Sequence, residues 1–235
     1  MAKTAKRAAR KKAPVKKAPA RKARAKKAPA KATPNKAGDL IEDRRKKRMK
    51  VYGANFKKPV AVFRGEELGD FKIDVLAFKK SVGGEQGFAL ATNGMSDHRT
   101  PKPKPSEAYP QVELLWFTRD VTPEKVEFLY WVATQPFTTH KPVEFGEFVS
   151  APKAPLSGCE AKDVTFLRPI TTSERLMHTD LALMAGYFEL FVMHLLLPKE
   201  FHHVKKSDRN FNQFLDLLDK NGYPLFFDPK RKSYL

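Results

Sequence analysis

Hydrophobic positions between residues 60 and 118 form short runs that turn residues separate. The run FKIDVLAF, at 71–78, alternates apolar and polar positions, which is the period of a half-buried strand. Its apolar face holds Phe71, Ile73, Val75 and Ala77, and Lys72 and Asp74 lie on the other face. Further strands are predicted at VAVF (60–63), GFALAT (87–92) and QVELLWFT (111–118). This spacing indicates an antiparallel or mixed sheet.

Two helices have clear sequence signals. Thr122 can cap the first, Pro123 suits its first turn, and Pro136 is expected to end it. Its apolar stripe is Val126, Leu129, Tyr130 and Ala133. The second helix is predicted from Ser207 or Asp208 to Gly222, with a stripe of Phe211, Phe214, Leu215 and Leu218.

The chain between these helices is less clearly patterned. Residues 138–180 are expected to be loop-rich, with strand candidates at EFVS (147–150) and DVTFLR (163–168). The run YFELFVMHLLL, at 187–197, fits either a strand or a buried helix. The longer apolar stretch 181–197 contains a glutamate and a histidine and is too short to span a membrane comfortably, so we expect buried core.

Charge is distributed very unevenly along the chain. The formal net charge is +19, and residues 1–50 hold 21 of the 45 Lys and Arg but only three acids. Residues 51–235 hold the other 24 basic and 23 acidic residues, which leaves a net charge of +1. We therefore expect a disordered basic arm at 1–50 and a nearly neutral folded domain at 51–235.

The arm consists almost entirely of Lys, Arg, Ala and Pro. KKAP occurs three times before residue 30, and the first 38 residues contain no acid. A segment with so little apolar bulk cannot offset the entropy of ordering. Its generic partner is a polyanion, DNA or RNA, bound through phosphates without sequence readout. The predicted nucleic-acid-binding residues are Lys11, Lys12, Lys16, Lys17, Arg21, Lys22, Lys26, Lys27, Arg44, Arg45, Lys46, Lys47 and Arg48.

Other interpretations of the arm remain open. It resembles the tails of linker histones and of bacterial histone-like proteins in composition, but such an arm can also be a solubilising extension or a transit peptide. RRKKRMK, at 44–50, could act as a nuclear-import signal in a eukaryotic host. We expect a cytoplasmic protein, associated with the nucleoid or located in the nucleus according to the host, and no membrane partner.

The segment ATNGMSDHR contains the residue types of a hydrolytic triad. Ser96, Asp97 and His98 are consecutive, however, and consecutive side chains point in different directions. The G-x-S-x-G elbow is also absent. We predict that Gly94, Met95, Ser96 and Asp97 form a turn, in which Gly94 supplies backbone freedom and the polar side chains bond to local amides.

Other candidate sites do not reach a recognisable pattern. His194, His202 and His203 fit no common metal-ligand spacing, and SVGGEQG lacks the lysine and helix of a phosphate loop. Trp116 and Trp131 lie on elements expected to face the core, and Cys159 lies in a predicted loop. We therefore predict no catalytic residue, no metal and no cofactor.

The order of these segments resembles the suppressor of fused domain. The resemblance rests on ATNGMSD (91–97), on VELLWF followed by a capped helix, and on LLLPKE (195–200), and it covers about 185 residues. It implies an α+β fold, with a mixed, mainly antiparallel sheet and packed helices. It also implies a non-enzymatic module that binds a protein segment, or a toxin in the manner of an immunity protein.

Two functions follow as hypotheses. The first is a protein-binding module that the polycationic arm tethers to nucleic acid. The alternative is a histone-like, sequence-nonspecific nucleic-acid-binding protein whose folded domain serves docking or dimerisation. In the second case the arm carries the function, and in the first case the domain does.

Overall fold

The computed structural model describes residues 36–65, 72–98, 111–185 and 188–235. The predictions made for residues 1–35, including all eight basic residues proposed there to bind nucleic acid, lie outside these ranges. Residues 35–235 form one compact unit. Among the described residues, no helix has the length and apolar character needed to cross a membrane.

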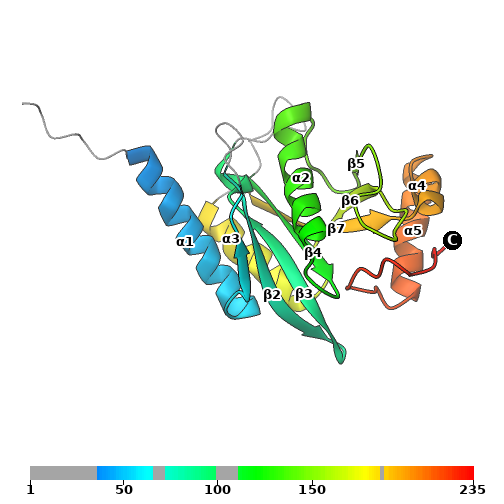
Figure 1. The fold of residues 1–235 in the computed structure, drawn as a ribbon, viewed down its shortest axis with the longest axis horizontal. Helices are drawn as coiled ribbons and strands as arrows, with labels where there is room; N and C mark the ends of the chain where they lie inside the picture. The colour runs from blue at the N-terminus through cyan, green and yellow to red at the C-terminus, as the bar shows by residue number, and fades with distance from the viewer. Residues whose placement is uncertain (1–35, 66–71, 99–110, 186–187) are drawn as a thin grey trace, which may run out of the picture. The chain divides into compact units, whose positions relative to one another are not determined.

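A seven-stranded sheet forms the centre of this unit (Figure 1). The strand order is β1-β2-β3-β4-β7-β6-β5, and every pair is antiparallel except β4 with β7. The prediction of a mixed, mainly antiparallel sheet is confirmed. The strands are β1 (Ala61–Phe63), β2 (Asp74–Val82), β3 (Glu85–Asn93), β4 (Gln111–Thr118), β5 (Phe148–Ser150), β6 (Asp163–Leu167) and β7 (Phe188–Leu196).

Helices cover both faces of the sheet. Val75 and Ala77 of β2 pack in one core with α2 (Pro123–Thr139). Leu76 and Phe78 pack in a second core with α1 (Lys36–Phe56) and α3 (Thr172–Ala185). The expectation of a half-buried strand is therefore wrong here, because helices distant in sequence cover the second face.

Helix α2 begins as its sequence signals predict. The hydroxyl of Thr122 accepts a hydrogen bond from the amide of Lys125, and Pro123 lies in the first turn. The predicted stop at Pro136 is wrong, because α2 continues to Thr139. Phe137 extends the apolar stripe and is 9% exposed. Packing of this side chain therefore offsets the loss of the backbone hydrogen-bond donor at Pro136.

The second half of the chain contains a helix that hydrophobic periodicity did not reveal. Helix α3 begins within the region expected to be loop-rich and ends beyond it, and it starts where Glu174 Oε2 accepts a hydrogen bond of 3.3 Å from the amide of Thr171. This T-x-x-E spacing is a helix-start signal that the sequence contained. The strand alternative for 187–197 is confirmed, since Phe188–Leu196 is β7.

Of the last two helices, α5 lies close to its predicted position, whereas α4 was not predicted. Helix α4 (Pro198–Val204) follows β7, and α5 (Asp208–Lys220) begins where the Ser207 hydroxyl accepts from the amide of Asn210. Gly222 follows α5 with a φ of 71°, a conformation that favours glycine.

Residues 36–50 are helical, although they were assigned to the disordered arm. They form most of α1, whose Tyr52 and Phe56 are buried against the sheet. The compact unit therefore starts near residue 35 and not at residue 51. Charge alone suggested the later boundary, because the basic cluster 44–50 looks like a continuation of the arm.

Candidate functional site

The turn after β3 holds the residues that resemble a triad. It is a short 3-10 helix, η1 (Met95–Asp97), and Gly94 precedes it with a φ of 128°. The predicted turn is confirmed. Gly94 is also in close contact with the Lys72 carbonyl and the Arg45 guanidinium, which a Cβ atom would approach to 2.4 and 2.5 Å. Both its conformation and its surroundings therefore require glycine.

The carboxylate of Glu113, on β4, accepts hydrogen bonds from this turn. Its Oε1 accepts hydrogen bonds from the amides of Gly94 (3.0 Å) and Ser96 (3.1 Å) and from the Ser96 hydroxyl (2.6 Å). Its Oε2 accepts from the Thr92 hydroxyl at 2.6 Å. The carboxylate is completely buried, so these donors replace the water that it loses.

The three triad-like residues contact three different groups. The Ser96 hydroxyl donates to Glu113, Asp97 accepts from arginines of α1, and the rings of His98 and Phe137 form a T-shaped pair with centroids 5.7 Å apart. A hydrolytic triad requires the histidine to receive the serine proton. Here the serine proton is directed to the Glu113 carboxylate, which also accepts from three other donors, so the residues stabilise the turn.

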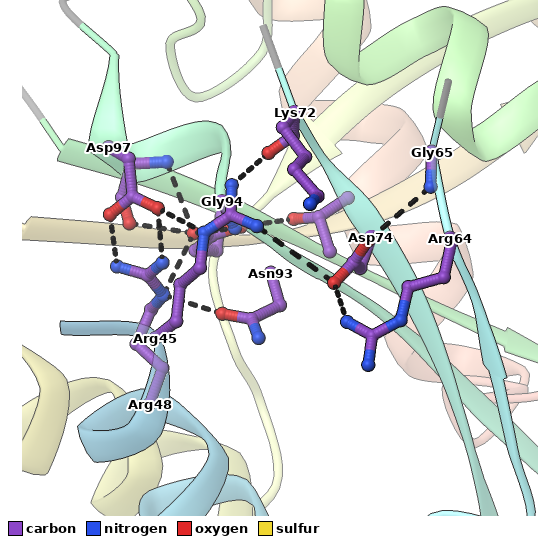
Figure 2. Close-up of polar contacts among 12 residues, drawn as sticks. Arg45, Arg48, Arg64, Gly65, Lys72, Asp74, Asn93, Gly94 and Asp97 are labelled. Carbon is purple, nitrogen blue, oxygen red and sulfur yellow. Dashed lines mark hydrogen bonds and ion pairs between the residues drawn. The ribbon is translucent and has the colours of Figure 1, made fainter. Parts of the chain in front are cut away.

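Two arginines of α1 bind Asp97. Arg48 forms a bidentate pair, with Nη1 2.9 Å from Oδ1 and Nη2 2.8 Å from Oδ2. Arg45 donates from Nε to Oδ2 at 2.8 Å. Figure 2 shows both side chains directed from α1 toward Asp97. Such fork-to-carboxylate pairs are among the stronger hydrogen-bonded contacts in proteins.

The contacts continue on either side of Asp97. Arg48 Nε donates to Asn93 Oδ1 at 2.8 Å and lies 3.3 Å from Glu113 Oε1. On the other side, Arg45 contacts the Lys72 carbonyl and Asp74. Arg64, the residue after β1, donates to Asp74 at 2.7 Å (Figure 2). We call Arg45, Arg48, Arg64, Asp74, Asp97 and Glu113 the arginine–carboxylate network.

The network balances its own charge. Three guanidinium groups face three carboxylates, and the side chains of Asp97 and Glu113 are fully buried while that of Arg48 is 4% exposed. Burial alone would lower the pKa of Arg48, but the charges of Glu113 and Asp97 outweigh it and raise the pKa. Arg48 therefore stays charged, and the network attaches α1 to β3 and β4 by buried ion pairs.

Tyr52 lies one turn beyond Arg48 and completes this attachment. Its ring is fully buried, and its hydroxyl donates to the Thr92 carbonyl at 3.0 Å. Burial, and then the charge of Glu113, raise the pKa of the hydroxyl well above its usual range. The phenol therefore remains a neutral hydrogen-bond donor.

The structure divides the predicted nucleic-acid-binding cluster at 44–48. Arg45 and Arg48 point inward and pair with Asp97, so their contacts differ from the phosphate binding predicted for them. Arg44, Lys46 and Lys47 are exposed, and the two lysines form ion pairs with Glu42 and Asp43 one turn earlier, at 3.7 and 2.8 Å. Exposed ion pairs of this kind contribute little to stability, and they leave the lysine ammonium groups accessible to phosphates.

The inward arginines had a signal in the sequence that went unused. Arg45, Arg48, Tyr52 and Phe56 follow one another at helical spacing, and the last two are large apolar residues. Their partner Asp97 lies 49 residues beyond Arg48, and no local pattern connects the two. The helix could have been predicted, but the ion pairs could not.

The side chains of Cys159, Trp116 and Trp131, also considered as candidate sites, take part in the packing of the core. Among the described residues, no group of three or more His, Cys, Asp and Glu side chains could hold a metal ion. Cys159 is a free thiol buried in the core beside α2. Trp116 is 1% exposed in the same core, and Trp131 is partly buried and stacks on Phe128 at 5.8 Å.

Comparisons with known proteins agree with this fold. The suppressor of fused protein family model matches residues 69–232. The structure is similar to the crystal structure of a suppressor of fused homologue from Neisseria gonorrhoeae FA 1090, with a TM-score of 0.63 and 13% sequence identity. The match covers 83% of this chain and 98% of that one. No curated protein matches the sequence significantly. The family match spans more than half of the chain, which therefore belongs to the suppressor of fused protein family.

Proposed function

We propose that this protein is a non-enzymatic protein-binding module whose folded unit, residues 36–235, recognises a protein partner, and whose basic arm tethers it to nucleic acid. Family membership supports the binding role, because suppressor of fused domains are protein-interaction or regulatory modules. The partner is a segment of a regulatory protein, or a toxin if the protein serves immunity.

The observation that carries the proposal is the arginine–carboxylate network. It fixes the start of the folded unit to the centre of the sheet through buried ion pairs. Ser96 and Asp97, two of the three residues that could have formed a hydrolytic site, are bound within this attachment.

A hollow at one edge of the sheet supports partner binding. It has a volume of about 380 Å³ and lies between β5 and the start of α5. Its apolar lining includes Phe145, Phe148 and Phe211, and Phe145 is 43% exposed. An exposed aromatic residue beside an apolar hollow is typical of surfaces that receive a partner side chain.

Capture of a partner tests the protein-binding role. We expect residues 36–235 to retain a specific protein from a host lysate, and Phe145→Asp to reduce the amount captured at least tenfold. Leu176→Asp is the matched control, since Leu176 is an apolar residue of α3 that is 58% exposed. Equal capture by the wild type and both variants would count against this hollow as the binding surface. Capture of nothing above background would count against the protein-binding role.

Binding of duplex DNA tests the tether. We expect the full chain to retard DNA at low salt, and a chain starting at residue 36 to retard it much less. If the arm neutralises about eight phosphates, affinity falls roughly 10⁴-fold between 50 and 200 mM salt. Equal retardation by both chains would refute this division of roles. Strong DNA binding without any captured protein would favour the alternative, a histone-like protein whose folded unit serves docking or dimerisation.

A further inference from the structure

Glu200 forms a second buried ion pair, far in sequence from the arginine–carboxylate network. Its side chain is completely buried at the start of α4, and it faces Arg231, whose side chain is 11% exposed. Nη1 and Nη2 of Arg231 lie 2.6 Å from Oε1 and Oε2, respectively. Nη2 also donates to the Leu195 carbonyl at 2.9 Å. We call Glu200 and the Leu195 carbonyl the Glu200 site.

The geometry of the Glu200 site is specific for a guanidinium group. A planar fork with two parallel donors matches the carboxylate, and a third donor reaches the carbonyl. An ammonium group has no fixed fork and cannot reproduce this pattern. Tyr234 completes the contacts, since its amide donates to Glu200 Oε1 at 3.1 Å and its ring lies 4.6 Å from the Arg231 guanidinium carbon.

The site is built by elements that do not depend on residues 228–235. Glu200 accepts a hydrogen bond of 2.8 Å from the amide of Leu197, so its position is fixed as part of the helix start. The core beside it is formed by buried residues of β6, β7, α4 and α5, including Leu196, Val204 and Phe214, and Tyr234 packs against it from outside. The position of Glu200 itself is therefore set by the start of α4 and by this core.

Residues 228–235 are held differently from the rest of the folded unit. They form no helix or strand, and among their described contacts with other segments the main ones are made by the Arg231 side chain, the Tyr234 amide and ring, and the Leu235 carbonyl. Lys230 and Lys232 are exposed. The segment begins with a turn, in which the Arg231 amide donates to the Asp228 carbonyl at 3.2 Å, and it is held through one arginine and one aromatic residue three positions later.

An empty Glu200 site would be unfavourable. Removal of Arg231 would leave a buried carboxylate without a counter-charge, and such uncompensated charges are strongly destabilising. The pKa of Glu200 already reflects this balance: burial would raise it, but the hydrogen bonds and charge of Arg231 lower it. Displacement of residues 228–235 therefore becomes favourable only when another guanidinium takes their place.

We propose that the Glu200 site recognises an arginine in a basic segment of a protein partner, and that residues 228–235 occupy this site in the unbound protein. The proposal rests on the protein-binding function proposed above and names one feature of the partner. The partner segment carries arginine and, three residues later, an aromatic side chain, as Arg231 and Tyr234 do. Binding then requires exchange of one arginine for another at Glu200.

A competition experiment with a defined peptide tests this exchange. The probe is the fluorescein-labelled peptide DPKRKSYL, which has the sequence of residues 228–235. We expect it to bind the Arg231→Gln protein at least tenfold more tightly than the wild type in fluorescence anisotropy, because the variant leaves the site open. The peptide DPKKKSYL has the same charge and should bind at least tenfold more weakly. The double variant Arg231→Gln/Glu200→Gln should lose the preference for arginine.

Lys230→Gln is the matched control protein, because it removes an exposed charge next to Arg231 and leaves the site occupied. It should bind the peptide as weakly as the wild type. Equal affinity for the lysine and arginine peptides, or equal binding to the wild type and Arg231→Gln, would show that the site does not recognise a displaced guanidinium, and would overturn the proposal.

Hydrogen exchange of the wild-type protein provides a test that does not depend on the folding of a variant. The proposal requires the Tyr234 amide to exchange faster than the Leu114 amide of β4, because residues 228–235 must open without global unfolding. Equal exchange rates would overturn it. Captured partner that is unaffected by excess DPKRKSYL would also reject the Glu200 site, while the proposed protein-binding function would stand.

Discussion

The Arg48 guanidinium and the Asp97 carboxylate form a bidentate ion pair, with distances of 2.9 and 2.8 Å, although 49 positions separate them in sequence. Their side chains are 4% and 0% exposed. The pair joins a helix of strongly basic sequence to the turn after β3. A residue that composition places in an arm is therefore one of the most deeply buried charged groups of the folded unit.

Asp97→Asn should destabilise the folded unit strongly. The change leaves two buried guanidinium groups facing a neutral amide, and breaking a buried pair of this kind costs about 3–5 kcal/mol. Urea denaturation followed by circular dichroism measures the loss. Asp43→Asn is the control, because its pair with Lys47 is exposed, and we expect a change below about 1 kcal/mol. Similar losses for the two variants would contradict the structural role of the network.

Gly94→Ala should also lower the free energy of unfolding. The new Cβ would lie 2.4 Å from the Lys72 carbonyl oxygen, and the φ of 128° is unfavourable for alanine. We expect a loss of roughly 2–4 kcal/mol, at the upper end for single substitutions. Gly53→Ala in α1 is the comparison, because a Cβ there meets nothing within 4 Å. A neutral Gly94→Ala would mean that the turn is not as tight as described.

Truncated chains should show that α1 is needed for the stability of the folded unit and that the arm is not. A chain starting at residue 36 should unfold at the same temperature as the full chain. A chain starting at residue 57 should unfold at a much lower temperature or not fold, because it lacks Arg48, Tyr52 and Phe56 and exposes Phe78 of β2. Differential scanning calorimetry makes the comparison. Equal stability of the two truncated chains would show that α1 is not part of the fold.

Ser96→Ala should affect stability and not catalysis. Its hydroxyl donates to Glu113 at 2.6 Å, and loss of a buried hydrogen bond to a charged group costs about 1.5–3 kcal/mol. Hydrolysis of a panel of esters and peptides should stay at the background rate for the wild type and the variant alike. A measurable wild-type rate that the variant loses would revive the triad interpretation.

Acid should destabilise the protein partly through His194. Burial, and then the charge of Arg231, lower its pKa to about 4, against an ordinary value of 6.5. The unfolded state therefore binds more protons between these values, and stability falls as the pH falls from 6.5 to 4. The loss is at most roughly 3 kcal/mol, and less to the extent that the ring is partly exposed. Chemical denaturation at several pH values measures it, and His194→Phe should flatten the profile. An unchanged profile in this variant would remove His194 as the cause.

In the same experiment, Glu200 should affect stability at a lower pH than His194 does. Its pKa is lowered in the folded state, so the stability that it contributes is present above the unfolded pKa and is lost as the pH falls through the folded value. Glu200→Gln should lose this contribution at neutral pH and show a shallower decline in acid. A steeper decline in the variant than in the wild type would contradict the assignment.

Several elements of the fold were predictable because their signals are local. The caps at Thr122 and Ser207, the alternation in β2 and the glycine of the η1 turn each depend on residues within a few positions of one another. The T-x-x-E start of α3 was equally local but was overlooked among loop residues. Local signals fail where packing outweighs them, as at Pro136 inside α2.

The sequence by itself determined the strands, the helix starts at Thr122 and Ser207, and the charge asymmetry between arm and domain. Only the tertiary structure decided that residues 36–50 belong to the folded unit, that Arg45 and Arg48 face Asp97, and that Arg231 faces Glu200. The physical reason is that an exposed arginine and a buried, paired arginine have the same local sequence. Which of the two forms depends on carboxylates that the sheet and the helix starts bring close from tens of residues away.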